Sequence, residues 1–417
     1  MTETQHKRFE LVEIHLPVGL TFAGLVAGLG VGALLADSSL IEPIKAVTDP
    51  IGSLWLRALQ MTIIPLVASL LLLGIAQMAR AAKAGAAARR MMLLVFAVLA
   101  IGGAITAIVM PMLLKAFPIP DAASGFLASV PDGEQQLPGI GDFVTSLVTS
   151  NIVQAAAETA MLPLTIFFAL FALALTRLPQ EQGDRLLGLF HALGNAMLVV
   201  IGWVLWLAPI GVMALAIGVA AQAGGGAFAA LAHYILVVSA MGGFVFLGAY
   251  LVAWLVGKQN PLAFGRAMIP AQAVALSTQS SLASLPAMLD SASRLKLRQE
   301  TAEFVLPLAV AIFRATSPAM NLAVAIYVAH MAGIALSPAI LVAGIAVALI
   351  ISIGSVSLPG SISFVISVGP IALAMGAPIE PLALLVAVEM LPDIMRTLGN
   401  VTMNVAVASA VDRVGSD

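Results

Sequence analysis

A stripe of polar residues runs along an apolar segment near the end of the chain, and its residue types could bind a charged solute. The segment EMLPDIMRTLGNVTMN carries Glu389, Asp393, Arg396, Thr397, Asn400 and Asn404. Intervals of three to four residues place side chains on one face of an α-helix. If this helix spans a membrane, Asp393 and Arg396 must face the protein interior, because an uncompensated charge there costs about 2.5–3.5 kcal/mol.

Two interpretations of this stripe stand side by side. In the first, Asp393 and Arg396 neutralise each other as a static pair three residues apart. In the second, they bind a zwitterion with an acidic side chain: Arg396 holds a carboxylate bidentately, Asp393 takes an ammonium group, and Asn400 donates its amide to a second carboxylate. The second interpretation also explains why Thr397 and Asn404 share the stripe.

The composition of the chain predicts that lipid surrounds the helices that position these residues. Of the 417 residues, 61% are hydrophobic and 10% are charged, whereas soluble domains carry about 25% charged residues. A spanning helix needs about 20 predominantly apolar residues. Eight segments qualify, at approximately 15–36, 51–79, 91–116, 143–176, 186–220, 227–256, 300–331 and 376–410.

Two further apolar segments, at about 262–290 and 338–372, are interrupted by serine and proline in ALSTQSSLASLPAML and ISIGSVSLPGSISFVISV. Broken backbone is tolerated at membrane depth only inside protein or beside a watery cavity. Paired broken segments are typical of a transporter's binding site. We therefore expect two re-entrant helical hairpins; a pair of proline-kinked ordinary spans is the alternative.

The distribution of basic residues predicts the orientation, since cytoplasmic loops carry an excess of lysine and arginine. A set of basic residues near the ends of the spans falls on one side if both termini are cytoplasmic: His6, Lys7, Arg8, Arg80, Lys83, Arg89, Arg90, Lys258, Arg266, Arg294, Lys296 and Arg298. The opposite 118–141 loop contains acidic residues and no lysine or arginine. Eight spans with both ends inside are self-consistent.

Several functional classes are disfavoured by the composition. The net charge of -2 provides no basic excess for nucleic acid. The chain has no cysteine, and its five histidines lack an HExxH spacing, so no metal site or other cofactor is expected. An intramembrane enzyme is not expected either, because aspartyl proteolysis needs two catalytic aspartates and only Asp393 is deeply placed.

Several motifs together resemble the dicarboxylate/amino acid:cation symporter family of glutamate and aspartate transporters, over roughly residues 15–412. The segment D-x-x-R-T-x-x-N-V, at 393–401, is similar to the family's eighth-span signature. Ser280 and Ser281 resemble the tip of its first hairpin, and Pro359 and Gly360 the tip of its second. FVLPL at 304–308 and QMTIIPLVASLLLLGIAQM at 60–78 resemble the seventh and second spans.

The resemblance implies an all-α elevator transporter with eight transmembrane helices and two hairpins, commonly a homotrimer in the lipid of the bacterial inner membrane. A scaffold at about 15–79 and 143–220 would hold the trimer. A transport part, at about 91–116 and 227–412, would carry a small anionic substrate. By the same resemblance, Arg396 would bind the side-chain carboxylate, Asp393 the amino group and Asn400 the main-chain carboxylate. The remaining candidate substrate-binding residues are Thr397, Ser317, Ser280, Ser281, Pro359 and Gly360.

The chain departs from the family pattern after FVLPL, where the family usually has GATINMDGT and this sequence has AVAIFRATS. Phe313, Arg314 and Ala315 stand at the Asn, Met and Asp positions, and Ser317 at the last Thr. Asn404 stands at a second cation-site carboxylate. Our hypothesis is that Arg314 replaces the coupling cation, so transport does not need sodium. Alternatively, Arg314 is a structural partner of Asp393 or Glu389, or it adds a ligand for a substrate carboxylate.

The driving force and the substrate stay open at this point. Proton coupling could use Glu389, Asp393 or Glu158, because burial favours the neutral form of a carboxylate; exchange or facilitated diffusion is equally open. Retention of Asp393 favours acidic amino acids such as aspartate or glutamate. A transporter or exchanger of dicarboxylates or other small carboxylates is the alternative, and an anion channel is a candidate from another class.

Overall fold

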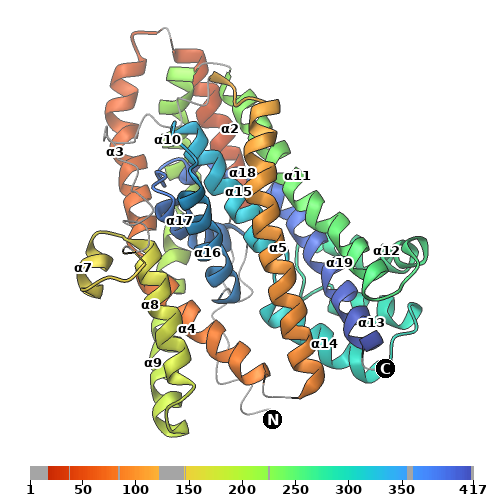
Figure 1. The fold of residues 1–417 in the computed structure, drawn as a ribbon. Helices are drawn as coiled ribbons and strands as arrows, with labels where there is room; N and C mark the ends of the chain where they lie inside the picture. The colour runs from red at the N-terminus through yellow and green to blue at the C-terminus, as the bar shows by residue number, and fades with distance from the viewer. Residues whose placement is uncertain are drawn as a thin grey trace.

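The protein is an elongated bundle of helices (Figure 1). The computed structural model describes residues 17–36, 38–82, 85–121, 145, 147–223, 226–354 and 360–414, and these residues form helices and turns without strands. The helices are α2 (Val18–Leu35), α3 (Ile41–Gln60), α4 (Ile63–Ala82), α5 (Ala86–Ala116), α7 (Ile152–Ala157), α8 (Met161–Leu175), α9 (Gln180–Trp206), α10 (Ala208–Ala223), α11 (Gly226–Leu255), α12 (Pro261–Thr278), α13 (Leu285–Arg294), α14 (Gln299–Ile312), α15 (Thr316–Met331), α16 (Pro338–Gly354), α17 (Gly360–Ala374), α18 (Leu382–Val388) and α19 (Met390–Val414).

Within the described residues, five helical stretches are long and apolar enough to cross a membrane: Ile41–Ala79, Ala88–Ala116, Gln180–Trp206, Gly226–Leu255 and Gln299–Met331. The last of these stretches is much more deeply buried than most of the others. Of its most apolar window, 89% is buried, against 33% for three of the other four. The Gln299–Met331 stretch therefore lies inside the protein, where its backbone can break without meeting lipid.

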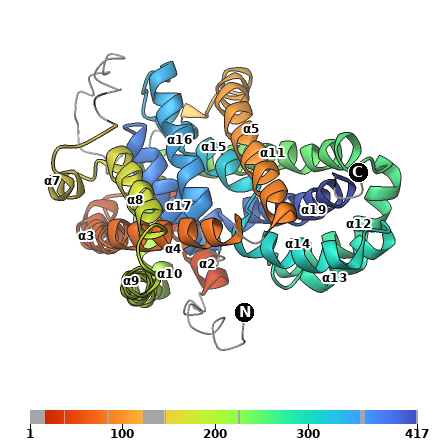
Figure 2. The same cartoon turned by 60° about the horizontal axis from the view of Figure 1, so that its bottom comes forward.

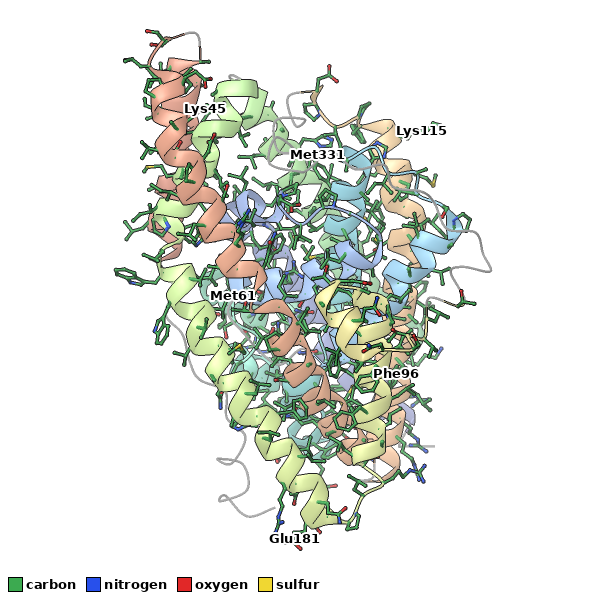
Figure 3. The ribbon with its side chains drawn as sticks, turned by 90° about the vertical axis from the view of Figure 1, so that its left-hand side faces the viewer. Lys45, Met61, Phe96, Lys115, Glu181 and Met331 are labelled. Carbon is green, nitrogen blue, oxygen red and sulfur yellow. The ribbon has the colours of Figure 1, made fainter. Side chains whose placement is uncertain are left out.

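Several predicted spans have different bounds in the structure; the fifth, expected at 186–220, is divided at Leu207 into α9 and α10. The second was expected at 51–79, but its helix begins at Ile41 and continues through Pro50. The break comes instead at Met61 and Thr62, between α3 and α4. Figure 3 shows Met61 midway along the molecule, with Lys45 toward one end and Glu181, at the start of α9, at the other. The fourth span was expected at 143–176; most of its start lies outside the described residues, and α7 and α8 cover 152–157 and 161–175.

Helices α2 and α10 pack backbone to backbone through a stripe of glycines. Gly24, Gly28 and Gly32 are spaced by four residues, so they share one face of α2. A Cβ on any of them would lie 2.4–2.5 Å from a carbonyl oxygen of α10, at Pro209, Met213 or Ile217. Small residues at this spacing allow close helix contact where lipid supplies no hydrophobic driving force.

The first interrupted segment forms two packed helices joined by a turn, as its serine-rich break predicts. α12 ends at Gln279, whose positive φ of 49° turns the chain, and α13 begins at Leu285 and packs against α12. In the second segment α16 packs against α17. Its predicted tip lies in residues 355–359, outside the described residues.

Helix α19 carries the polar stripe and is surrounded by other helices. Its neighbours are α5, α11, α12, α13, α14 and α15, and Figure 2 shows α19 between α11 on one side and α14 on the other. Gly242 of α11 permits this close approach, because a Cβ there would lie 3.0 Å from the Cβ of Met395. The polar face of α19 is thus enclosed by protein, as its charges require.

Candidate functional site

The last predicted span is broken at Glu389, at the start of the polar stripe. α18 ends at Val388 and α19 begins at Met390. Pro392 lies in the first turn of α19, where its missing N–H leaves no hydrogen bond unmade, and the next residue, Asp393, donates its N–H to the carbonyl of Glu389 at 2.9 Å. Glu389 therefore joins the two helices, and the residue is only 1% exposed.

The guanidinium of Arg396 is engaged at all three of its nitrogens. Nη2 donates to Glu389 Oε1 at 2.6 Å, and Nη1 donates to Asn321 Oδ1 at 2.7 Å. Nε forms an ion pair with Asp393 Oδ1 at 3.3 Å. Arg396 and Asp393 are each 8% exposed. The predicted couple is present, but the shorter contacts of Arg396 are with Glu389 and with a residue of α15.

Tyr234 of α11 completes this group by donating its hydroxyl to Glu389 Oε2 at 3.2 Å. We call Tyr234, Asn321, Glu389, Asp393 and Arg396 the charged cluster. Three helical elements contribute to it, and both oxygens of Glu389 are hydrogen-bonded within it. Buried charges are tolerated when they are paired and hydrogen-bonded in this way.

Hydrogen bonds lead from the charged cluster to the second hairpin segment. Asn321 Nδ2 donates to Ser317 Oγ at 3.0 Å, and the hydroxyl of Ser352 in α16 lies 2.9 Å from the same oxygen. Ser352 lies two residues before the end of α16, next to the predicted tip. The candidate substrate residue Ser317 is therefore buried between the charged cluster and this hairpin.

Asn400 joins the first turn of α15 to α19. Its Oδ1 accepts hydrogen bonds from both the N–H and the hydroxyl of Thr316, each at 3.0 Å. Gly399 permits this approach, because a Cβ there would lie 2.5 Å from the Cγ2 of Thr316. Both hydrogen bonds use the side-chain oxygen of Asn400, and its expected role in binding a substrate carboxylate stays a prediction.

The family's cation-binding segment forms a break between α14 and α15 in the predicted 300–331 span. Phe313 has extended backbone, and Phe313 and Ala315 are fully buried. The Arg314 side chain interacts electrostatically with Asp393 and Arg396. This agrees with the alternative in which Arg314 is a partner of Asp393, and it places a second guanidinium beside the charged cluster.

Asn404 differs from the other polar residues of the stripe. The residue is completely buried, and neither its Oδ1 nor its Nδ2 has a hydrogen-bond partner among the described residues. Phe313 and Ala315 offer no side-chain oxygen, and Asn404 offers one neutral oxygen. Sodium prefers several oxygen ligands, so the side chains at these positions do not fit it well. Among the described residues, no group of three or more histidine or acidic side chains could hold a metal ion.

The candidate serines of the first hairpin tip lie in a turn of their own, apart from the charged cluster. Ser280 accepts hydrogen bonds from Ala283 and Ser284 within its own turn, and Ser281 is half-buried beside it. Gly360 begins α17, and Pro359 lies outside the described residues. Thr397 is buried on α19. The structure thus brings Arg396, Asp393 and Ser317 together but leaves the two serines of the first tip in a separate turn.

Three residues of this site were not predicted from the sequence: Asn321, Tyr234 and Ser352. Asn321 had a detectable signal, because it is an amide in the middle of the apolar helix α15. Tyr234 and Ser352 had none, since tyrosine and serine are common in apolar helices. Glu389 was placed on the stripe, but its pairing with Arg396 seven residues away was not foreseen.

Comparisons with known proteins agree with the resemblance in the sequence. Residues 18–414 match the sodium:dicarboxylate symporter family. A proton/sodium-glutamate symport protein of Bacillus subtilis is 26% identical over 94% of this chain and 91% of its own length. A proton/glutamate-aspartate symporter of Escherichia coli is 28% identical over 85% and 82%. A neutral amino acid transporter B(0) of Homo sapiens is 26% identical over 93% and 78%.

Proposed function

Because this chain belongs to the sodium:dicarboxylate symporter family, we propose that it is a secondary transporter that carries acidic amino acids such as aspartate or glutamate across the inner membrane. The multi-pass helical structure and the names of its relatives support transport of amino acids. The finer assignment depends on one observation: Arg396 and Asp393, of opposite charge, lie side by side in the protein interior. An amino acid with an acidic side chain carries the complementary groups.

The proposed binding mode assigns one group of the substrate to each side chain. Arg396 binds the side-chain carboxylate, because a guanidinium matches the two carboxylate oxygens. Asp393 binds the ammonium group, and the amide nitrogen of Asn400 binds the main-chain carboxylate. Ser317 lies at the edge of this site, and the hairpin segments carrying Ser280, Ser281, Pro359 and Gly360 close over it. Movement follows the elevator scheme, with residues 91–116 and 227–412 as the moving part of each subunit of a homotrimer.

We also propose that transport does not require sodium. Arg314 supplies a fixed positive charge beside Asp393 and Arg396, at the segment where relatives carry cation-site residues. A fixed charge can offset the binding of an anion in a medium of low dielectric constant, as a co-transported cation would. Transport is then coupled to protons or is uncoupled.

Proteoliposomes test both parts of the proposal. Uptake of labelled L-aspartate and L-glutamate should saturate, show counterflow and proceed at an unchanged rate when choline replaces sodium. A collapse of uptake in choline would exclude the sodium-independent mechanism while leaving the carrier intact. Anion current without saturation or counterflow would instead indicate a channel.

One observation favours a second candidate, a transporter of dicarboxylates. Arg314 and Arg396 place two guanidinium groups near each other, and two carboxylates of one substrate could each use one of them. Competition by succinate against L-aspartate distinguishes the candidates: a dicarboxylate transporter should bind succinate more tightly than L-aspartate.

A further inference from the structure

We propose that Glu389 couples proton uptake to substrate binding: the substrate carboxylate displaces Glu389 from Arg396, and Glu389 then binds one proton. This inference rests on the proposed function, because it takes Arg396 as the carboxylate-binding residue. No bond other than that of the proton forms or breaks; the proton comes from water on the side from which the substrate enters.

The first step of the argument is the position of Glu389. Its Oε1 receives Arg396 Nη2 at 2.6 Å, its Oε2 receives the Tyr234 hydroxyl at 3.2 Å, and the residue is 1% exposed. Glu389 therefore pairs with Arg396 much as a substrate carboxylate would. It is an internal counter-ion at the binding residue.

The second step is geometric. A carboxylate can approach a guanidinium bidentately either end-on, at Nη1 and Nη2, or from the side, at Nε and Nη2. Both approaches use Nη2, the nitrogen that donates to Glu389. A substrate carboxylate bound in either way would place its negative charge close to that of Glu389, in a buried site. Glu389 must then move away, lose its charge, or do both.

The third step is a count of the buried charges. With all four groups ionised, Arg314 and Arg396 contribute two positive charges and Glu389 and Asp393 two negative charges, so their sum is zero. Aspartate or glutamate adds a net charge of about -1 at neutral pH. One proton restores neutrality, and a carboxylate left in a buried site without its cation is neutralised rather than kept ionised.

The surroundings select Glu389 rather than Asp393 as the proton acceptor. Asp393 interacts with two guanidinium groups, those of Arg396 and Arg314, and the substrate's ammonium group would add a third positive partner. Within the described part of the chain, Glu389 is hydrogen-bonded to one guanidinium, that of Arg396, and it also interacts with Asp393 and Tyr234.

Within the described residues, the helices around Glu389 contribute few other titratable groups. α2, α10 and α17 pack against α18 and contain no titratable residue in their sequences. α11 contributes Tyr234 and, next to it, His233, whose Nδ1 lies 3.1 Å from the hydroxyl of Tyr327 in α15; Tyr327 in turn contacts Tyr234 rather than Glu389. Tyr234 can hydrogen-bond with either form of the acid, because a hydroxyl both donates and accepts.

Calorimetry of L-aspartate and L-glutamate binding to the purified full-length protein tests the inference. Titrations at one pH in buffers of different ionisation enthalpy give the number of protons bound with each substrate molecule. We expect about one proton for the wild type and none for Glu389→Gln, whose amide side chain cannot take up a proton in this pH range. The matched control is Glu303→Gln, at an exposed glutamate hydrogen-bonded to Gln299, which should behave as the wild type.

Each outcome decides between the claims. Wild-type binding without proton uptake, or unchanged uptake in Glu389→Gln, overturns the role of Glu389 and leaves the carrier proposal intact. If neither amino acid binds the wild type, the proposed substrate class fails and this inference fails with it. Should Glu389→Gln not fold, the wild-type affinity decides: it must fall about tenfold per pH unit above the range where free Glu389 ionises, and a flat profile overturns the inference.

Discussion

The two polar parts of α19 differ in how their side chains are held. Around Arg396, the acid, base, amide and phenol groups of the charged cluster are hydrogen-bonded to one another. About two turns further along, Asn404 is equally buried, yet neither of its polar side-chain atoms has a partner among the described residues. The residues that would bind a substrate thus form a complete network, whereas those at the family's cation positions do not. The contrast is what we expect if, as proposed above, this chain keeps the substrate chemistry of its family and does not use a coupling sodium ion.

Arg396→Ala removes the guanidinium at the centre of the hydrogen-bonded charged cluster, and it should have the largest effect of the three substitutions. It leaves Glu389 and Asp393 buried without that cation, and removing one partner of a buried ion pair costs about 3–5 kcal/mol. We expect a loss of that size in the free energy of unfolding, measured by chemical denaturation in detergent, together with loss of L-aspartate binding. The control is Arg298→Ala, whose half-exposed pair with Asp412 should contribute less than about 1 kcal/mol. Equal losses in the two variants would contradict the structure.

Asp393→Asn sharpens the assignment of the amino group and should have an intermediate effect. A hydrogen bond to a charged group contributes about 1.5–3 kcal/mol, which corresponds to roughly 10- to 100-fold in affinity. L-aspartate should lose this much affinity in a competition assay. Succinate, which has no ammonium group, should not. A parallel loss for both ligands would show that Asp393 only positions Arg396.

Asn404→Leu tests the second polar region, where the buried amide has no hydrogen-bond partner among the described residues, and it should have the smallest effect. Leucine has a similar shape and no polar group, and an unsatisfied buried amide costs about 1–3 kcal/mol. We expect the variant to be more stable by about 1 kcal/mol, measured by denaturation in choline chloride. The wild type should unfold at the same temperature in sodium and in choline. Stabilisation by sodium that disappears in Asn404→Leu would identify Asn404 as a cation ligand after all.

Much of the fold could be predicted from hydrophobicity, because a helix in lipid needs a long apolar run. The helices broken inside the protein were harder. The break at Phe313 and Arg314 contains neither glycine nor proline, so the local sequence does not predict it. The broken backbone is tolerated because the surrounding stretch is almost entirely buried. Conversely, the second span was expected to begin at residue 51, but its helix begins at Ile41 and continues through Pro50.

The site was predictable only where its residues share one helix. Helical periodicity placed Asp393, Arg396 and Asn400 on one face of α19. It could not say that Arg396 prefers Glu389 and Asn321, because that choice depends on how α15 and α11 pack against α19. Partners from other helices carry no signature in the spacing of a single segment.

The glycine stripe of α2 has a consequence for any motion of the protein. With Gly24, Gly28 and Gly32 seated on carbonyl oxygens of α10, the two helices interlock at the level of their main chains. Sliding one along the other by a single residue would drive neighbouring side chains into that backbone. The α2–α10 pair should therefore behave as one rigid body. Distances from this pair to α19 would show whether, and how far, the charged residues move relative to it.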